Sequence, residues 1–293
     1  MASPSWTTPG KILLATDLSS RCDRALDRAA QLAGQWQARL LVLHAMDPAE
    51  AFLEARRLDY LPTWRRPPDP ARLVEAQIRR DLREQPGDVA VRVETGMPAA
   101  VIEEVAQAEG CGLIVTGVAR DESLGRQLLG TTVDRLVRRS TIPILTVKSR
   151  LRPYDEIVVA TDFSDPSRQA LEAAAKLFPR SAITLLHAFE MPFAGLLDRH
   201  DLGDRFRALE VEACDEFLAA SALSEEVRRR VRVLIEHGPP EAVIRAYLRE
   251  RNVNLVVLGT HGRSAAFDIL IGSTAKGILH SAPADVLLIR QPQ

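Results

Sequence analysis

The 293-residue sequence lacks the features of a membrane or secreted protein. No apolar run approaches the roughly 20 residues that a membrane-spanning helix needs. The first residues, MASPSWTTPGK, lack the basic region and the apolar core of a secretory signal peptide. Hydrophobic residues make up 46% of the chain and charged residues 26%, which is ordinary for a globular protein. We therefore expect a cytoplasmic protein.

An excess of charge of either sign is missing as well, because the formal net charge is −1. Arginine pairs such as Arg56–Arg57 and Arg138–Arg139 stand among acidic neighbours, a pattern typical of solvated helix faces. A nucleic-acid-binding surface would instead gather basic residues on one face. Nucleic acid is therefore not an expected partner.

Cysteine is scarce, and the three residues Cys22, Cys111 and Cys214 are far apart. They are odd in number and show no metal-ligand spacing. We expect reduced thiols without a disulfide, metal or redox role.

Signatures of several reactions are also absent. The run from Gly272 to Lys276 has the wrong spacing for a G-x4-G-K-[ST] phosphate loop, and no G-x-G-x-x-G follows the first predicted strand. The G-x-S-x-G nucleophile elbow and the H-E-x-x-H zinc motif do not occur either. No reaction can therefore be assigned, and no metal ligands can be named.

An internal repeat organises what the sequence does contain. EIVVATDFS repeats KILLATDLS, ITLLHAFE repeats LLVLHAMD, and GPPEAVI repeats GMPAAVI. Gly96, Gly117 and Gly130 stand a constant 142 positions before their counterparts in the second copy. A period this long indicates a duplicated domain and not a solenoid. We predict two domains, 11–149 and 154–291, with the boundary near 150–153.

Each copy alternates buried strands with amphipathic helices. In the first copy the strands are predicted at 11–16, 38–46, 89–94, 113–116 and 144–147, with a helix at 21–34 capped by Ser19 or Ser20. This order, with right-handed crossovers, predicts an α/β fold in which each copy is an open parallel sheet with helices on both faces.

The stretch around Gly259, Gly262 and Gly272 has the features of a phosphate-binding loop. It follows a buried strand, and Ser273 and Thr274 begin a helix after it. Two glycines past a strand allow positive φ and close approach of a ligand, and the free N–H groups of a helix start attract phosphate. These features indicate a nucleotide site.

A carboxylate is expected beside this loop. Asp162 ends the first strand of its copy, and Gly259 ends the fourth, so the two meet if those strands are neighbours. The carboxylate can accept a hydrogen bond from ribose or base, or contact a metal ion through water. Taken alone, an Asp after a strand is more often a turn former or helix cap. His44 and His187 end core strands and are expected to be packed and hydrogen-bonded, whereas His261 lies inside the loop.

With these motifs the sequence resembles the universal stress protein family in its tandem form, from residue 11 to residue 290. The most specific part is the motif G-x2-G-x9-G-S of the second copy. The resemblance implies Rossmann-like domains, similar to adenine-nucleotide alpha hydrolases, each with a five-stranded sheet of order 3-2-1-4-5. It also implies ATP as ligand, with Mg or Mn as a possible companion, pairing of the domains through their last strands, and a possible homodimer.

The resemblance carries a set of site residues onto each copy. In the second copy these are Ala160, Thr161, Asp162, Ala188, Leu258, Gly259, His261, Gly262, Gly272, Ser273 and Thr274. In the first copy they are Ala15, Thr16, Asp17, Ala45, Gly117, Arg120, Gly130, Thr131 and Thr132. Arg120 stands where the second copy has Gly262. Its side chain should narrow the approach to the phosphates and disfavour positive φ, or else contact phosphate itself.

Two further hypotheses remain open beside a cytoplasmic stress-response protein that binds ATP in its C-terminal domain. One is an interaction protein with vestigial pockets, which recruits partners through the helical surfaces 48–85 and 196–222. The other is a weak ATPase, whose hydrolysis should be slow because no base is evident.

Overall fold

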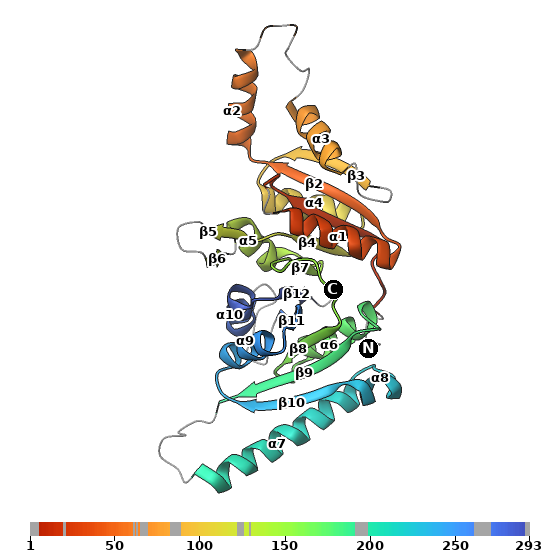
Figure 1. Cartoon of the computed structure of the whole chain (residues 1–293), viewed down its shortest axis with the longest axis vertical. Coiled ribbons are helices and arrows are strands. Elements are labelled where there is room, and N and C mark those ends of the chain that lie inside the picture. Colours follow the sequence, from red (N-terminus) through yellow and green to blue (C-terminus); the bar gives the residue numbers. More distant parts are fainter. Residues whose placement is uncertain are drawn as a thin grey trace. The chain divides into compact units, whose positions relative to one another are not determined.

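The computed structural model describes residues 6–19, 22–60, 62, 64, 70–82, 89–121, 126–128, 130–190, 199–260 and 271–290. The chain divides into two compact units, of which one runs from Pro9 to Leu151 and the other comprises the chain from Arg152 onward together with the described residues before Pro9 (Figure 1). We call them the N-terminal and C-terminal repeats.

The N-terminal repeat contains a five-stranded parallel sheet of order β3-β2-β1-β4-β7. Its elements are β1 (Lys11–Thr16), α1 (Asp23–Trp36), β2 (Arg39–Met46), α2 (Pro48–Asp59), α3 (Pro70–Asp81), β3 (Val89–Thr95), α4 (Pro98–Ala108), β4 (Leu113–Thr116), β5 (Ala119–Asp121), β6 (Arg126–Leu128), α5 (Thr131–Arg139) and β7 (Ile144–Thr146). Strands β5 and β6 form a separate antiparallel pair.

The C-terminal repeat has the same strand order, β10-β9-β8-β11-β12, again parallel. Its elements are β8 (Glu156–Thr161), α6 (Asp165–Leu177), β9 (Ala182–Phe189), α7 (Arg199–Ala220), α8 (Glu225–Arg230), β10 (Arg232–His237), α9 (Pro240–Glu250), β11 (Leu255–Gly259), α10 (Ser273–Ser281) and β12 (Asp285–Ile289). The predicted order 3-2-1-4-5 is confirmed in both repeats.

The core follows from the sequence pattern. The central strands are apolar on both faces, and their middle residues are buried, as in β1 and β11. Helix α1 presents Ala25, Ala29 and Leu32, which are spaced for one helical face and are fully buried. In the C-terminal repeat α6 packs on β8, β11 and β12, whereas α9 packs on β9 and α10. Helices cover both faces of each sheet (Figure 1).

The start of α1 differs from the prediction. Its N-cap is Cys22, without a side-chain cap, so the prediction that Ser19 caps the helix is wrong. The Ser19 hydroxyl instead donates to Asp17 Oδ1 (2.6 Å), because the chain turns between the strand and the helix. Ser20, the other predicted cap, lies outside the described residues.

The second helix pair of the C-terminal repeat meets through one large and one small residue. In the C-terminal repeat the Glu241 side chain of α9 lies against Gly277 of α10. The same positions in the N-terminal repeat hold Ala99 on α4 and Arg135 on α5. The large residue is therefore on the earlier helix of the pair in the C-terminal repeat and on the later helix in the N-terminal repeat.

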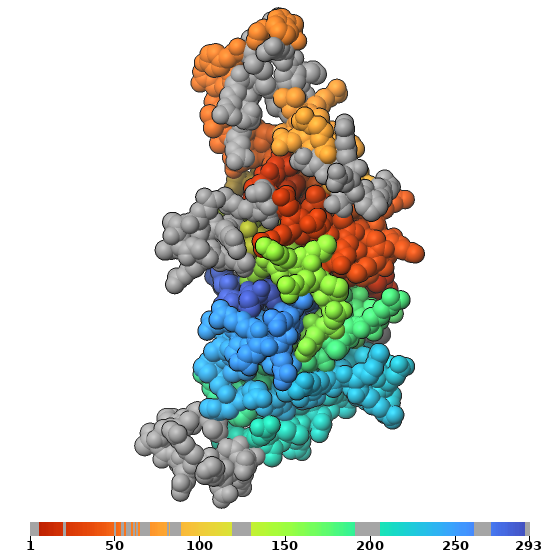
Figure 2. Space-filling model, viewed as in Figure 1, coloured from red at the N-terminus to blue at the C-terminus, as the bar shows by residue number. Residues whose placement is uncertain are grey.

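The crossover between the second and third strands also differs between the repeats. In the N-terminal repeat it forms α2 and α3, which extend beyond the edge strand β3 and are orange in Figures 1 and 2. Four large apolar residues of this segment are exposed to solvent, with exposed fractions of 62% for Phe52, 62% for Leu53, 83% for Tyr60 and 76% for Trp64. None of the described helices is long and apolar enough to cross a membrane.

Candidate functional site

The strand order fixes where a ligand can bind. β8 pairs with β9 on one side and with β11 on the other, so the chain switches direction across the sheet at this strand. Ligands of open α/β sheets lie outside the carboxyl ends of the strands at such a point. Asp162 directly follows β8, and Gly259 ends β11. The predicted meeting of this carboxylate with the glycine loop therefore follows from the topology.

A cleft with an empty volume of about 770 Å³, open to solvent, lies at this position. Its lining residues are Ala160, Thr161, Asp162, Ser167, Leu186, Ala188, Pro240, Ile244, Leu258, Gly259, Gly272, Ser273, Thr274, Ala275 and Ile278. Nine of the eleven residues predicted for this repeat are among them. The other two, His261 and Gly262, lie outside the described residues.

One side of the cleft is the start of α10. Gly272 is the N-cap, with no side chain that caps the helix, and the first helical bond runs from Lys276 N to Gly272 O at 2.9 Å. The N–H groups of the first turn therefore have no partner within the helix. No acidic residue lies in this turn, and Ser273 and Thr274 are exposed beside it. Such a helix end can hold an anion such as phosphate.

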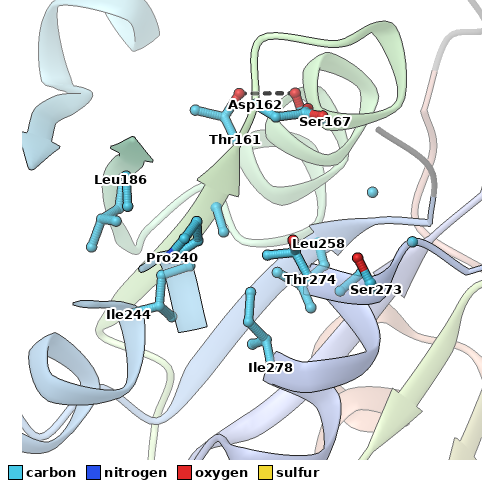
Figure 3. Close-up of a pocket in the computed structure, with 15 residues that line it drawn as sticks. Thr161, Asp162, Ser167, Leu186, Pro240, Ile244, Leu258, Ser273, Thr274 and Ile278 are labelled. Carbon is cyan, nitrogen blue, oxygen red and sulfur yellow. Dashed lines mark hydrogen bonds between the residues drawn. The ribbon is translucent and has the colours of Figure 1, made fainter. Parts of the chain in front are cut away.

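The other side of the cleft is apolar. Leu186 and Ala188 come from β9, Pro240 and Ile244 from α9, and Ile278 from α10 (Figure 3). In Figure 3, Leu186, Pro240 and Ile244 lie to the left of Asp162, whereas Ser273 and Thr274 at the helix start lie to its right. A ligand that joins a flat apolar group, a hydroxylated sugar and a phosphate fits this order, since each part meets the surface that favours it.

Asp162 also shapes the local backbone. Its Oδ1 accepts hydrogen bonds from the backbone N–H (3.1 Å) and the hydroxyl of Ser164, and Phe163 between them has φ of 61°. Asp17 makes the same bonds to Ser19 N (2.9 Å) and Oγ, and Leu18 has φ of 60°. Both aspartates are therefore turn formers, as expected for an Asp that follows a strand, and their carboxylates remain at the ends of the strands.

Gly259 lines the cleft, but it does not have the backbone conformation predicted for it. It is not among the glycines with positive φ that the described part of the chain contains. A Cβ at this position would lie 2.6 Å from the carbonyl carbon and oxygen of Pro166. The glycine is therefore required because β11 ends against the backbone of α6, and the expectation of a left-handed turn at this residue is wrong.

The two core histidines are packed and hydrogen-bonded, as predicted. His187 Nδ1 lies 2.8 Å from Thr161 O, so this nitrogen carries the proton and donates. His187 Nε2 lies 3.2 Å from the carboxylate of Glu210, and its ring lies 4.2 Å from the Phe163 ring. His44 Nδ1 bonds to Thr16 O in the same way at 2.9 Å.

Sequence reasoning missed part of the lining, namely Ser167, Leu186, Pro240, Ile244, Ala275 and Ile278. Ser167 Oγ lies 2.8 Å from Thr161 Oγ1, which anchors the first turn of α6 to the end of β8 (Figure 3). The alternation of side chains along β9 places Leu186 on the same face as Ala188, so Leu186 could have been found. The residues of α9 could not, because they reach the cleft only through helix packing.

The N-terminal repeat has a cleft at the equivalent position. It is lined by Ala15, Thr16, Asp17, Cys22, His44, Ala45, Asp47, Pro98, Thr116, Gly117, Val118, Gly130, Thr132 and Val133. Seven predicted residues line it, whereas Thr131 does not. The backbone of Arg120 is an extended strand paired with Gln127. The expected conflict with positive φ therefore does not arise there, and the Arg120 side chain lies outside the described part.

Charge and polarity distinguish the two clefts. Helix α5 carries Asp134 in its first turn, whereas the same position of α10 is Lys276. Cys22 takes the place of Ser167, and its thiol donates to Asp17 Oδ1 (3.1 Å). Burial raises the pKa of the Cys22 thiol to about 11. Within the described ranges, no group of three His, Cys, Asp or Glu side chains could hold a metal ion.

Both repeats match one protein family. The model of the "Universal stress protein family" matches residues 9–148 and residues 153–290. Universal stress protein MJ0531 of Methanocaldococcus jannaschii is 27% identical over 143 residues, covering 48% of this chain and 84% of that protein. Universal stress protein Rv2005c of Mycobacterium tuberculosis is 26% identical over 201 residues, covering 61% of this chain and 62% of that protein. The match thus spans less than two thirds of Rv2005c.

Solved structures show the same fold. PA1789 of Pseudomonas aeruginosa PAO1, a protein of unknown function, has a TM-score of 0.69 at 23% identity, with 97% of this chain and 93% of that chain covered. A universal stress protein of Archaeoglobus fulgidus has a TM-score of 0.67 at 19% identity, with 96% and 98% covered. Identities this low support the fold alone.

Proposed function

Because the chain belongs to the universal stress protein family, we propose that this stress-response protein binds ATP in the cleft of its C-terminal repeat, as a regulatory ligand. The observation that carries the proposal is the order of surfaces in that cleft: an apolar wall, the Asp162 carboxylate, and the uncapped start of α10. Each surface suits one part of an adenine nucleotide.

The residues would hold ATP as follows. The adenine ring would lie against Leu186, Pro240 and Ile244, where apolar area is removed from water. The ribose hydroxyls would donate to Asp162, since an ionised carboxylate can only accept. The phosphates would accept from the first-turn N–H groups of α10 and from the Ser273 hydroxyl. Mg²⁺ or Mn²⁺ would bind chiefly to phosphate oxygens and water, which is the ordinary arrangement for Mg²⁺ with a nucleotide.

Regulation by binding suits the cleft better than fast hydrolysis does. The described lining of the C-terminal cleft contains no histidine, and its one carboxylate, Asp162, already accepts two bonds from Ser164. A base that orients the attacking water is therefore not evident. We expect at most slow phosphate release, far below that of a dedicated ATPase.

Equilibrium dialysis with ATP tests the proposal directly. Gly272 has φ of −58° and ψ of 148°, which any residue can adopt, so Gly272→Val should fold and place a side chain where the phosphates would bind. Gly130→Val is the matched control, because Gly130 has φ of −61° and ψ of 151° at the start of α5. We expect Gly272→Val to weaken ATP binding at least tenfold and Gly130→Val to leave it unchanged. Absence of binding, or an equal loss in both variants, contradicts the proposal.

A second candidate function is that of an interaction protein. Large apolar side chains are exposed on α2 and just after it, and Leu209 on α7 is 60% exposed. Exposed apolar surface of this kind often contacts a partner. Under this hypothesis, Phe52→Ser with Leu53→Ser abolishes cellular activity and Gly272→Val does not. Cytoplasmic location, association of two chains, and pairing of the repeats through their last strands remain predictions.

A further inference from the structure

The N-terminal cleft differs from the C-terminal one at positions that face the ligand space. The strand residue Leu258 of the C-terminal cleft is replaced by Thr116, which is level with Ala15 on the neighbouring strand β1. The lining contains a second carboxylate, Asp47, in addition to that of Asp17. The N-terminal cleft is therefore more polar and more acidic than its counterpart.

Thr116 is a buried residue of the cleft lining, and its hydroxyl has no partner within the described part of the chain. The residue is 4% exposed, and its Oγ1 makes no hydrogen bond within the described part of the chain. Buried hydroxyls are nearly always hydrogen-bonded, because an unpaired one loses its bonds to water. A hydrogen-bonding group of a bound ligand would satisfy it. The apolar Leu258 makes no such demand in the C-terminal cleft.

The charges of the cleft disfavour phosphate. Asp17 and Asp47 line it, and Asp134 lies in the first turn of α5, where the helix end would otherwise attract an anion. Arg138 pairs with Asp134 at 3.0 Å, which weakens but does not reverse the effect. A triphosphate would meet like charge at this helix end.

We propose that the N-terminal cleft binds an uncharged nucleoside and excludes nucleoside triphosphates. The sugar hydroxyls donate to Asp17, a polar atom of the ligand bonds to Thr116, and no phosphate reaches the start of α5. The inference rests on the proposed function in one respect: it assumes that the N-terminal cleft, like the C-terminal one, binds a ligand that contains a nucleoside. One chain would then hold two different ligands.

Cys22 supplies a local readout for this cleft. It lines the N-terminal cleft, whereas Cys111 and Cys214 are buried elsewhere. Alkylation of each cysteine in the full-length protein can be followed at pH 9 by mass spectrometry of its peptide, with adenosine and ATP as probes. We expect saturating adenosine to slow alkylation of Cys22 at least fivefold, and ATP to leave it unchanged. The rate at Cys214 should not respond to either probe.

Variants then connect the protection to the residues of the cleft. Thr116→Val keeps the shape and removes the hydroxyl, so we expect about tenfold more adenosine to be needed for the same protection. Thr146→Val is the matched control, because Thr146 is equally buried and in register with Thr116 but does not line the cleft. Asp134→Lys should make ATP protective as well.

The outcomes separate this inference from the proposed function. Protection of Cys22 by ATP in the unaltered protein, absence of protection by adenosine, or an equal response of Thr116→Val and Thr146→Val would each overturn the inference. ATP binding that Gly272→Val abolishes is measured at the other cleft. Either the inference or the proposed function can therefore be disproved while the other stands.

Discussion

The substitution Gly259→Ala separates a structural from a ligand-binding role for the loop glycine. A Cβ at this position would lie 2.6 Å from the carbonyl carbon and oxygen of Pro166 and 2.9 Å from the N atom of Ser167. Ordinary contacts of a Cβ begin at 3.4 Å. All three atoms belong to the backbone of the first turn of α6. Since no side chain can rotate away, the turn must move by about 0.8 Å, the difference between the two distances.

The expected cost follows from overpacking in a dense interior. Forcing one extra carbon against fixed backbone costs about 1–3 kcal/mol. For a domain of about 150 residues each kcal/mol lowers the melting temperature by about 2–4 °C, so the expected fall is about 2–12 °C. The measurement is thermal unfolding of the nucleotide-free protein, followed by circular dichroism.

Gly34→Ala is the matched control. Gly34 lies in α1, and a Cβ there would meet nothing within 4 Å. This variant should be unchanged or more stable by up to about 1 kcal/mol, because alanine favours a helix. If Gly259→Ala has the same melting temperature as the unaltered protein in the absence of nucleotide, the packing argument is refuted. The glycine would then be explained by the ligand alone.

Three further predictions concern stability and thiol chemistry. Tyr154→Phe should cost about 1–3 kcal/mol in urea unfolding, since Tyr154 Oη donates to fully buried Asp285 at 2.6 Å; an unchanged midpoint contradicts this. Gly277→Ala should cost less than about 1 kcal/mol in the same assay, because the group it meets is the flexible Glu241 side chain; a cost as large as that of Gly259→Ala disproves the distinction. The alkylation rate of Cys22 should keep rising up to about pH 11, because burial raises the pKa of the thiol to about 11 and only the thiolate reacts. In the urea-unfolded chain the rate should stop rising near pH 9. Coincident pH profiles of the folded and unfolded chains rule out the raised pKa.

The fold could be predicted because its signals are local and repeated. Continuous apolar strands such as Lys11–Thr16 and Leu255–Gly259 are buried on both faces, and the internal repeat supplies two independent examples of each element. The right-handed crossover rule then restricts the topology. The β5–β6 pair was not predicted, because its strands of three residues are too short and polar to show alternation.

The candidate site was predictable only where it is built from strand ends. Asp162 and the start of α10 are set by the chain order, so sequence reasoning finds them. Ile244 reaches the cleft through the packing of α9 on the sheet, which leaves no local signal. The conformation of Gly259 was wrongly predicted for the same reason, because its close neighbours Pro166 and Ser167 belong to a helix far earlier in the chain.

The contact of Glu241 with Gly277 bears on how the two halves of the gene can exchange sequence. In the C-terminal half the bulky residue is Glu241, on the earlier helix, whereas in the N-terminal half the equivalent positions hold Ala99 on the earlier helix and Arg135 on the later one. A gene-conversion tract that copied only the later helix would place two bulky residues together in one product and two small ones in the other. In the C-terminal half, where the two residues are in contact, we therefore expect both positions to be inherited as a unit.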